Sequence, residues 1–139
     1  MPTHMTALRH RLAVSAILVS LGLAVPTWAL AQAHSHAAPN GGQIQKIGSY
    51  EGELVVRGSD IILYVVDANE KKVDAAPLSA TALVLAKGNE QKAVELKPAG
   101  DNKLAGKLDF PFEGKFRATV SLRTASGEAG KGRYSLDAK

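Results

Sequence analysis

Two histidines, His34 and His36, are the residues of this chain whose type and spacing point most directly to chemistry. They stand one residue apart and are the only imidazoles after residue 31. Neutral imidazole binds Zn²⁺, Cu²⁺, Ni²⁺ and Co²⁺. The sequence has no cysteine, and its two methionines lie within the first five residues. A soft, sulfur-rich Cu(I) site is therefore not expected.

Two imidazoles supply only half of a typical coordination sphere. Glu51 and Glu53 lie two residues apart on one face of a predicted strand and are possible extra ligands. Two carboxylates at this spacing could also form a catalytic pair, but against that use an ordinary solvent-exposed strand face is the favoured interpretation. The predicted metal site is therefore His34 and His36, with Glu51 and Glu53 as optional additions.

Residues 1–31 have the pattern of a secretory signal peptide. Basic residues precede an apolar run from 12 to 28. The small residues Ala29 and Ala31 then form a small-x-small motif, and the cleavage site follows it. An uncleaved membrane anchor is the alternative, because the apolar run approaches the length of a short span. Cleavage predicts a periplasmic protein with no stable membrane insertion. No cysteine follows the leader to carry a lipid anchor.

The position of the cut has a consequence for metal binding. Cleavage after Ala31 would begin the mature chain at Gln32, and cleavage after Ala33 would begin it at His34. Both cuts place a histidine third. A free amine, two deprotonated amides and a third-position imidazole offer four nitrogens in a plane, which suits Cu(II) or Ni(II).

Composition excludes several functional classes. The formal net charge falls from +4 to +2 without the leader, which contains two arginines and no acid. Lysines and acids alternate along the rest, so we expect neither a basic face nor nucleic-acid binding. Residues 43–139 contain no histidine or cysteine, so a serine or threonine nucleophile would lack its usual base and a cysteine nucleophile is impossible. The run 127–132 is glycine-rich but lacks the spacing of a phosphate loop. We therefore predict no enzyme activity.

The chain after the leader divides into a short tail and one β-domain. Residues 32–42 are small, polar and glycine-rich, which predicts a flexible tail. Residues 43–139 show short apolar alternations separated by turn residues, which predict a small antiparallel β-sandwich of immunoglobulin-like type with seven or eight strands. Leu63 and Val65 are expected in the core of a central strand that is buried on both faces. Strands are predicted at 43–47, 50–57, 60–67, 79–87, 91–97, 103–110, 115–123 and 133–136.

Several segments resemble a known family. They are the run from His34 to Gln43, the strand Tyr50-Glu51-Gly52-Glu53-Leu54, the strand Leu63-Tyr64-Val65-Val66-Asp67, and the turn Pro98-Ala99-Gly100-Asp101-Asn102. The chain resembles a small periplasmic β-domain of heavy-metal efflux systems, which occurs alone or at the N-terminal end of membrane-fusion adaptor subunits. The resemblance covers most of the mature chain. The richest tails of that family carry more than two histidines.

The resemblance implies a periplasmic accessory in heavy-metal handling or efflux that binds a divalent transition metal weakly through its tail. Its implied partner is a metal-efflux adaptor or transporter subunit. The chain lacks the helical hairpin and lipoyl-like segments that an adaptor itself would need. The alternative is a non-enzymatic interaction module of the cell envelope with no metal role.

Overall fold

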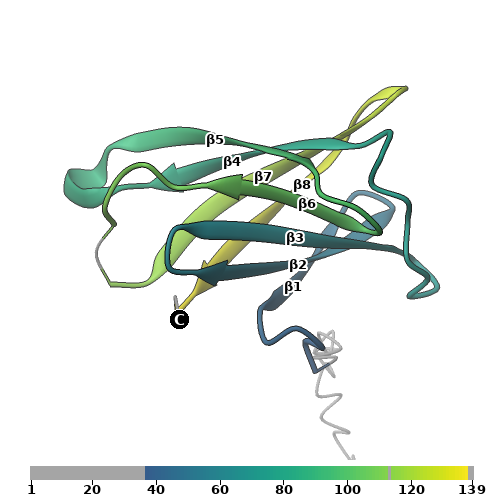
Figure 1. The fold of residues 1–139 in the computed structure, drawn as a ribbon, viewed down its shortest axis with the longest axis horizontal. Helices are drawn as coiled ribbons and strands as arrows, with labels where there is room; N and C mark the ends of the chain where they lie inside the picture. The colour runs from purple at the N-terminus through teal and green to yellow at the C-terminus, as the bar shows by residue number, and fades with distance from the viewer. Residues whose placement is uncertain (1–36, 113, 138–139) are drawn as a thin grey trace, which may run out of the picture. The chain divides into compact units, whose positions relative to one another are not determined.

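The computed structural model describes residues 37–112 and 114–137, and within them the fold is built almost entirely of β-strands (Figure 1). The predicted leader, His34 and His36 lie outside these residues. One short 3₁₀ turn, Lys87–Asn89, separates two of the strands. The strands are β1 (Gln43–Ile47), β2 (Tyr50–Arg57), β3 (Asp60–Asp67), β4 (Ser79–Leu85), β5 (Gln91–Pro98), β6 (Lys103–Lys107), β7 (Phe116–Thr124) and β8 (Gly127–Leu136).

All eight strands join in one antiparallel sheet in the order β1-β2-β3-β6-β5-β4-β7-β8. The sheet coils until its first and last strands, β1 and β8, lie side by side, which makes it a nearly closed barrel (Figure 1). The predicted all-β antiparallel class is confirmed. The finer expectation of an immunoglobulin-like sandwich stays a prediction. Within the described ranges, no helix is long and apolar enough to cross a membrane.

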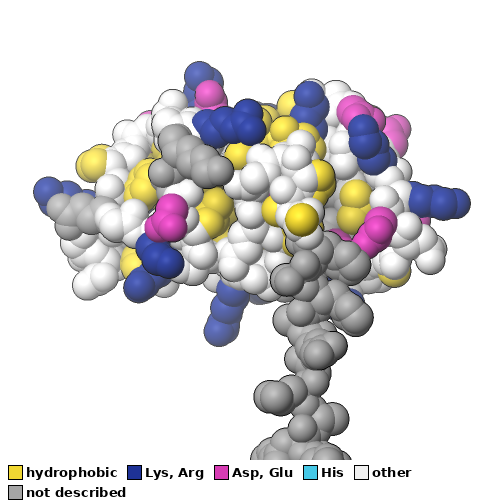
Figure 2. Space-filling model, turned by 90° about the horizontal axis from the view of Figure 1, so that it is seen from below, with side chains coloured by type: hydrophobic (Ala, Val, Ile, Leu, Met, Phe, Trp, Pro, Cys, Tyr) yellow, Lys and Arg dark blue, Asp and Glu magenta, His cyan; other side chains and the backbone are white. Residues whose placement is uncertain are grey.

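Alternation along the strands places one hydrophobic core inside the coiled sheet. On β3, Leu63 and Val65 are fully buried, as predicted. Their neighbours Ile62, Tyr64 and Val66 point outward and are only partly covered, so the expected burial of β3 on both faces is wrong for its outer face. A barrel has a single inner surface, so the other side chains of β3 face the exterior. The side of the molecule in Figure 2 accordingly shows hydrophobic areas between scattered charged side chains.

The last strand is longer than the sequence predicts. Residues 127–132 were expected to form a glycine-rich turn, but β8 already begins at Gly127 and pairs with β7 along its length. The actual turn is the two residues between Thr124 and Gly127. Glycine normally weakens a strand, but here the absence of a side chain lets β8 approach the end of β1 and the β1–β2 turn closely. A Cβ on Gly132 would press against Ile47, and one on Gly130 would collide with the backbone of Gly48.

The seam between β1 and β8 is held by side chains. The hydroxyl of Tyr134 donates a hydrogen bond of 2.8 Å to the carbonyl oxygen of Gly52 on β2. The amide of Ser135 donates one of 2.7 Å to the side-chain oxygen of Gln43. Tyr134 is 3% exposed. These contacts fasten the two ends of the sheet where no backbone ladder between described residues does so.

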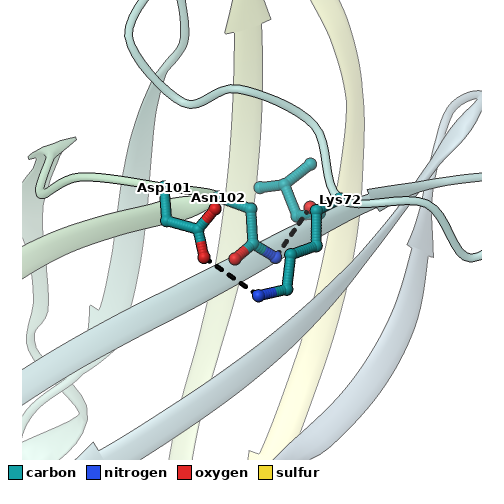
Figure 3. Close-up of polar contacts among 4 residues, drawn as sticks. Lys72, Asp101 and Asn102 are labelled. Carbon is teal, nitrogen blue, oxygen red and sulfur yellow. Dashed lines mark hydrogen bonds and ion pairs between the residues drawn. The ribbon is translucent and has the colours of Figure 1, made fainter.

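The turn between β5 and β6 is anchored to β3 by a buried asparagine. Asn102 is 4% exposed, and its side-chain amide donates a hydrogen bond of 3.0 Å to the carbonyl oxygen of Val65. The amide of Val65 in turn donates to the backbone oxygen of Asn102 at 2.9 Å. Beside it, the Asp101 carboxylate pairs with Lys72 at 3.0 Å (Figure 3). The turn 98–102 is therefore a structural clamp between β3 and the β3–β4 connection.

Removing the Tyr134 hydroxyl is predicted to loosen the seam. Tyr134→Phe should lower the free energy of unfolding by about 1–2 kcal/mol, because a buried carbonyl loses its donor. Burial raises the pKa of the Tyr134 phenol, so its contribution is complete below about pH 10 and declines as pH rises further, since the unfolded chain ionises first. Urea unfolding of both proteins should show their difference shrinking above that pH. Tyr64→Phe, on the outer face, is the matched control, and an equal loss in both variants would contradict the assignment.

Candidate functional site

The side chain of Glu53 is the best-held polar group on the outer surface of the barrel. It comes from the middle of β2, where it stands opposite Tyr64 of β3. One carboxylate oxygen accepts hydrogen bonds from the backbone amides of Asn40 and Gly42, at 2.8 and 2.9 Å. The other accepts one from the side-chain amide of Asn40 at 2.8 Å. The carboxylate therefore binds the last residues before β1.

These contacts cover Glu53 and leave it only 5% exposed. The expectation that Glu51 and Glu53 share an exposed strand face is thus wrong for Glu53. The segment before β1 folds into a turn, with the amide of Gly41 donating to the oxygen of Ala38 at 3.0 Å, and this turn lies over the carboxylate. A metal ion at Glu53 would have to compete with three hydrogen bonds, so Glu53 is better suited to position the turn than to ligate.

A cavity of about 350 Å³ opens beside this turn, over the outer face of β2 and β3. Its walls combine three carboxylates with apolar side chains. The lining residues are Ala37, Pro39, Ile44, Glu51, Glu53, Tyr64, Val66 and Glu70. The strand register explains the grouping, because Glu51 stands opposite Val66 and Glu53 opposite Tyr64, so all four side chains project from one face of the two strands.

The chemistry of the cavity is that of a cation-attracting pocket. Glu51 is half-buried and Glu70 is exposed on the turn that follows β3. Carboxylates gathered in a concave, partly apolar surface raise the local concentration of cations. Within residues 37–112 and 114–137, however, no group of three or more His, Cys, Asp or Glu side chains is arranged to hold a metal.

The structure brings together some of the predicted site residues and leaves others undescribed. Glu51 and Glu53 line the same cavity, whereas His34 and His36 lie outside the described residues. Ala37, the residue that follows His36, is part of the cavity wall. Glu70, which adopts a positive φ of 61° in the turn, was not among the predicted site residues. The run Asn40-Gly41-Gly42 could have suggested a turn, but not its carboxylate partner.

Comparisons of the chain with protein-family models, with curated proteins and with solved structures find no match.

Truncating Glu53 is predicted to release the turn. Glu53→Ala should lower the free energy of unfolding by about 1–3 kcal/mol and leave the amides of Asn40 and Gly42 without acceptors. Glu53→Gln should have a smaller effect. The glutamine oxygen can still accept from both backbone amides, and the side-chain amide of Asn40 can rotate by half a turn so that its oxygen accepts from the glutamine nitrogen. Hydrogen exchange should show fast exchange at Asn40 and Gly42 in the alanine variant. Unchanged protection of both amides in that variant would contradict the assigned role.

Proposed function

We propose that this protein is a non-enzymatic metal-binding accessory of the periplasm. In this proposal His34 and His36 capture a divalent transition ion, and the cavity beside Glu51 and Glu70 provides negative charge at the base of the tail. The observation that carries the proposal is the position of Ala37 in the cavity wall. The ion would be Cu(II), Ni(II), Zn(II) or Co(II), all of which accept imidazole nitrogen.

Covalent geometry supports the pairing of tail and cavity. His36 is bonded to Ala37, and His34 is three residues from it, so their Cα atoms lie within about 4 and 11 Å of that of Ala37. Glu53 fixes the following residues, Asn40 and Gly42, through hydrogen bonds of 2.8–2.9 Å. The imidazoles are therefore tethered near the carboxylates whatever conformation the tail takes.

Two donor sets are compatible with this tether. In one, an imidazole and a carboxylate such as Glu51 share the ion. In the other, the chain terminus after cleavage, two backbone amides and the third-position histidine bind Cu(II) or Ni(II) in a plane. Both sets weaken in acid, because imidazole, and in the second set the amine, must lose a proton to bind.

The protein is proposed to act in the periplasm together with a partner protein. The leader pattern in residues 1–31 favours export to the periplasm, and the family resemblance favours a metal-efflux adaptor or transporter subunit as partner. The immunoglobulin-like sandwich belongs to the proposal as well. It is supported by the β5–β6 pairing, which spans only Lys97 and Pro98 on β5, because so short a ladder leaves two four-stranded halves facing one core.

The test is a Cu(II) titration of the exported protein, with its N-terminus verified by intact mass. Replacing both His34 and His36 with alanine should weaken Cu(II) binding by at least roughly 10–100-fold. That is the loss of affinity when a residue that only supports a metal ligand is replaced, and these two are proposed as ligands themselves. Glu51→Gln should weaken it less. Glu95→Gln removes an equal charge from β5, away from the cavity, and should have no effect.

The outcomes separate the donor sets. An effect of the histidines with none from Glu51 identifies the terminal site and contradicts the role of the cavity. Metal binding that does not change when both histidines are replaced contradicts the proposal and favours the alternative, an interaction module whose tail has no metal role.

A further inference from the structure

The outer face of β4, β7 and β8 carries an arginine-rich surface that the metal proposal does not use. Arg117 and Arg123 project outward from β7, and Lys131 and Arg133 project outward from β8. Three of the four arginines after residue 31 thus lie on one sheet face. The sequence predicts no basic face, because the charges alternate along the chain. Strand pairing gathers them: Arg133 stands opposite Thr119, and Lys131 opposite Ser121.

This face has little internal neutralisation. Glu128 is 3.8 Å from Lys131 and stands opposite Arg123 in the strand register. On the neighbouring strand β5, Glu95 is 3.7 Å from Lys97. Within the part of the chain that the structure describes, no ion pair involves Arg117, Arg123 or Arg133. All three are exposed. Their guanidinium groups are therefore available for an anion, and guanidinium binds phosphate in a bidentate way.

An apolar groove lies between two of these arginines. It has a volume of about 430 Å³, and its lining includes Leu83, Leu85, Arg117 and Arg133. Leu83 is 41% exposed and is the one large hydrophobic side chain in the described residues that is so exposed. It stands opposite Thr119 on β7, which in turn stands opposite Arg133 on β8. Apolar and cationic groups therefore share one row of the sheet.

We infer that this face, which we call the arginine face (Leu83, Leu85, Arg117, Arg123, Lys131, Arg133), docks on the surface of an anionic phospholipid bilayer. A phospholipid presents a phosphate for the guanidinium groups and, just below it, apolar matter for Leu83. An acidic protein segment would satisfy the arginines but would cover Leu83 only if its own sequence carried an apolar side chain at that place, whereas a bilayer always presents both groups. The inference is independent of the metal proposal, because the arginine face and the cavity are built on different strands.

The experiment is sedimentation of the exported protein, its leader shown by mass to be removed, with vesicles. One set is phosphatidylcholine alone, and the other is phosphatidylcholine mixed with phosphatidylglycerol. We expect binding to the second set only, weakening as salt is added. The double variant Arg117→Ser with Arg133→Ser should partition about 30-fold less onto the anionic vesicles, because each basic residue near such a surface contributes about 1 kcal/mol to binding.

Two further variants make the test specific. Lys71→Ser with Lys103→Ser removes the same net charge near β3 and should change vesicle binding far less. Leu83→Ser should reduce vesicle binding while leaving any binding to soluble polyglutamate unchanged. Circular dichroism and thermal unfolding establish that each variant is folded.

Three results would overturn the inference. They are the absence of binding to phosphatidylglycerol vesicles at low salt, an equal loss in the two double variants, and arginine-dependent binding to polyglutamate without binding to vesicles. The last result would assign the face to an acidic protein partner instead.

Discussion

The close contact between Gly48 and Gly130 is the constraint on which the rest of this fold depends. The β1–β2 turn and β8 approach so nearly that a Cβ on Gly48 would collide with the backbone of Ala129, and one on Gly130 with the backbone of Gly48. This contact lets a single sheet of eight strands coil until its two edges meet, which removes most of the exposed strand edge. The hydrogen bond from Tyr134 to Gly52 then fastens the seam from within.

Closure of the sheet also creates two outer surfaces of opposite character. Over β2 and β3, Glu51, Glu53 and Glu70 line a cavity. Over β7 and β8, Arg117, Arg123 and Arg133 form a cationic surface in which Glu128 is the acid that stands opposite Arg123. A net charge of only +2 for the mature chain therefore hides a separation of charge that the strand register produces. The metal proposal uses the first surface, and the lipid inference uses the second.

The carboxylate of Glu53 links the fold to the candidate metal site. It is fixed by β2, and through three hydrogen bonds it fixes Asn40 and Gly42. The two histidines are attached to that turn through Ala37. A short polar segment that would otherwise have little reason to rest on the sheet is thereby held beside acidic groups. Glu53 thus works as an anchor for the turn that precedes β1.

Sequence patterns predicted the strands well where side chains alternate, as along β2, β3 and β7. They failed where the determinant is a partner distant in the chain. Glycine at 127–132 reads locally as a turn, and only the approach of Gly48 reveals why it forms a strand. Burial of Glu53 depends on Asn40, and the gathering of arginines depends on the pairing of β7 with β8. For the site, two carboxylates could be named in advance, but the cavity and Glu70 could not.

We propose that a metal held by the tail lies beside the cavity on β2 and β3. Cu(II) is paramagnetic and broadens the resonances of nearby amides, so nuclear magnetic resonance spectra of the exported protein with and without Cu(II) test it directly. We expect the amide resonances of Ala37, Glu51 and Glu70 to broaden first, and those of Arg117 and Arg133 to be unaffected. Broadening confined to another face, or none at stoichiometric Cu(II), would contradict it.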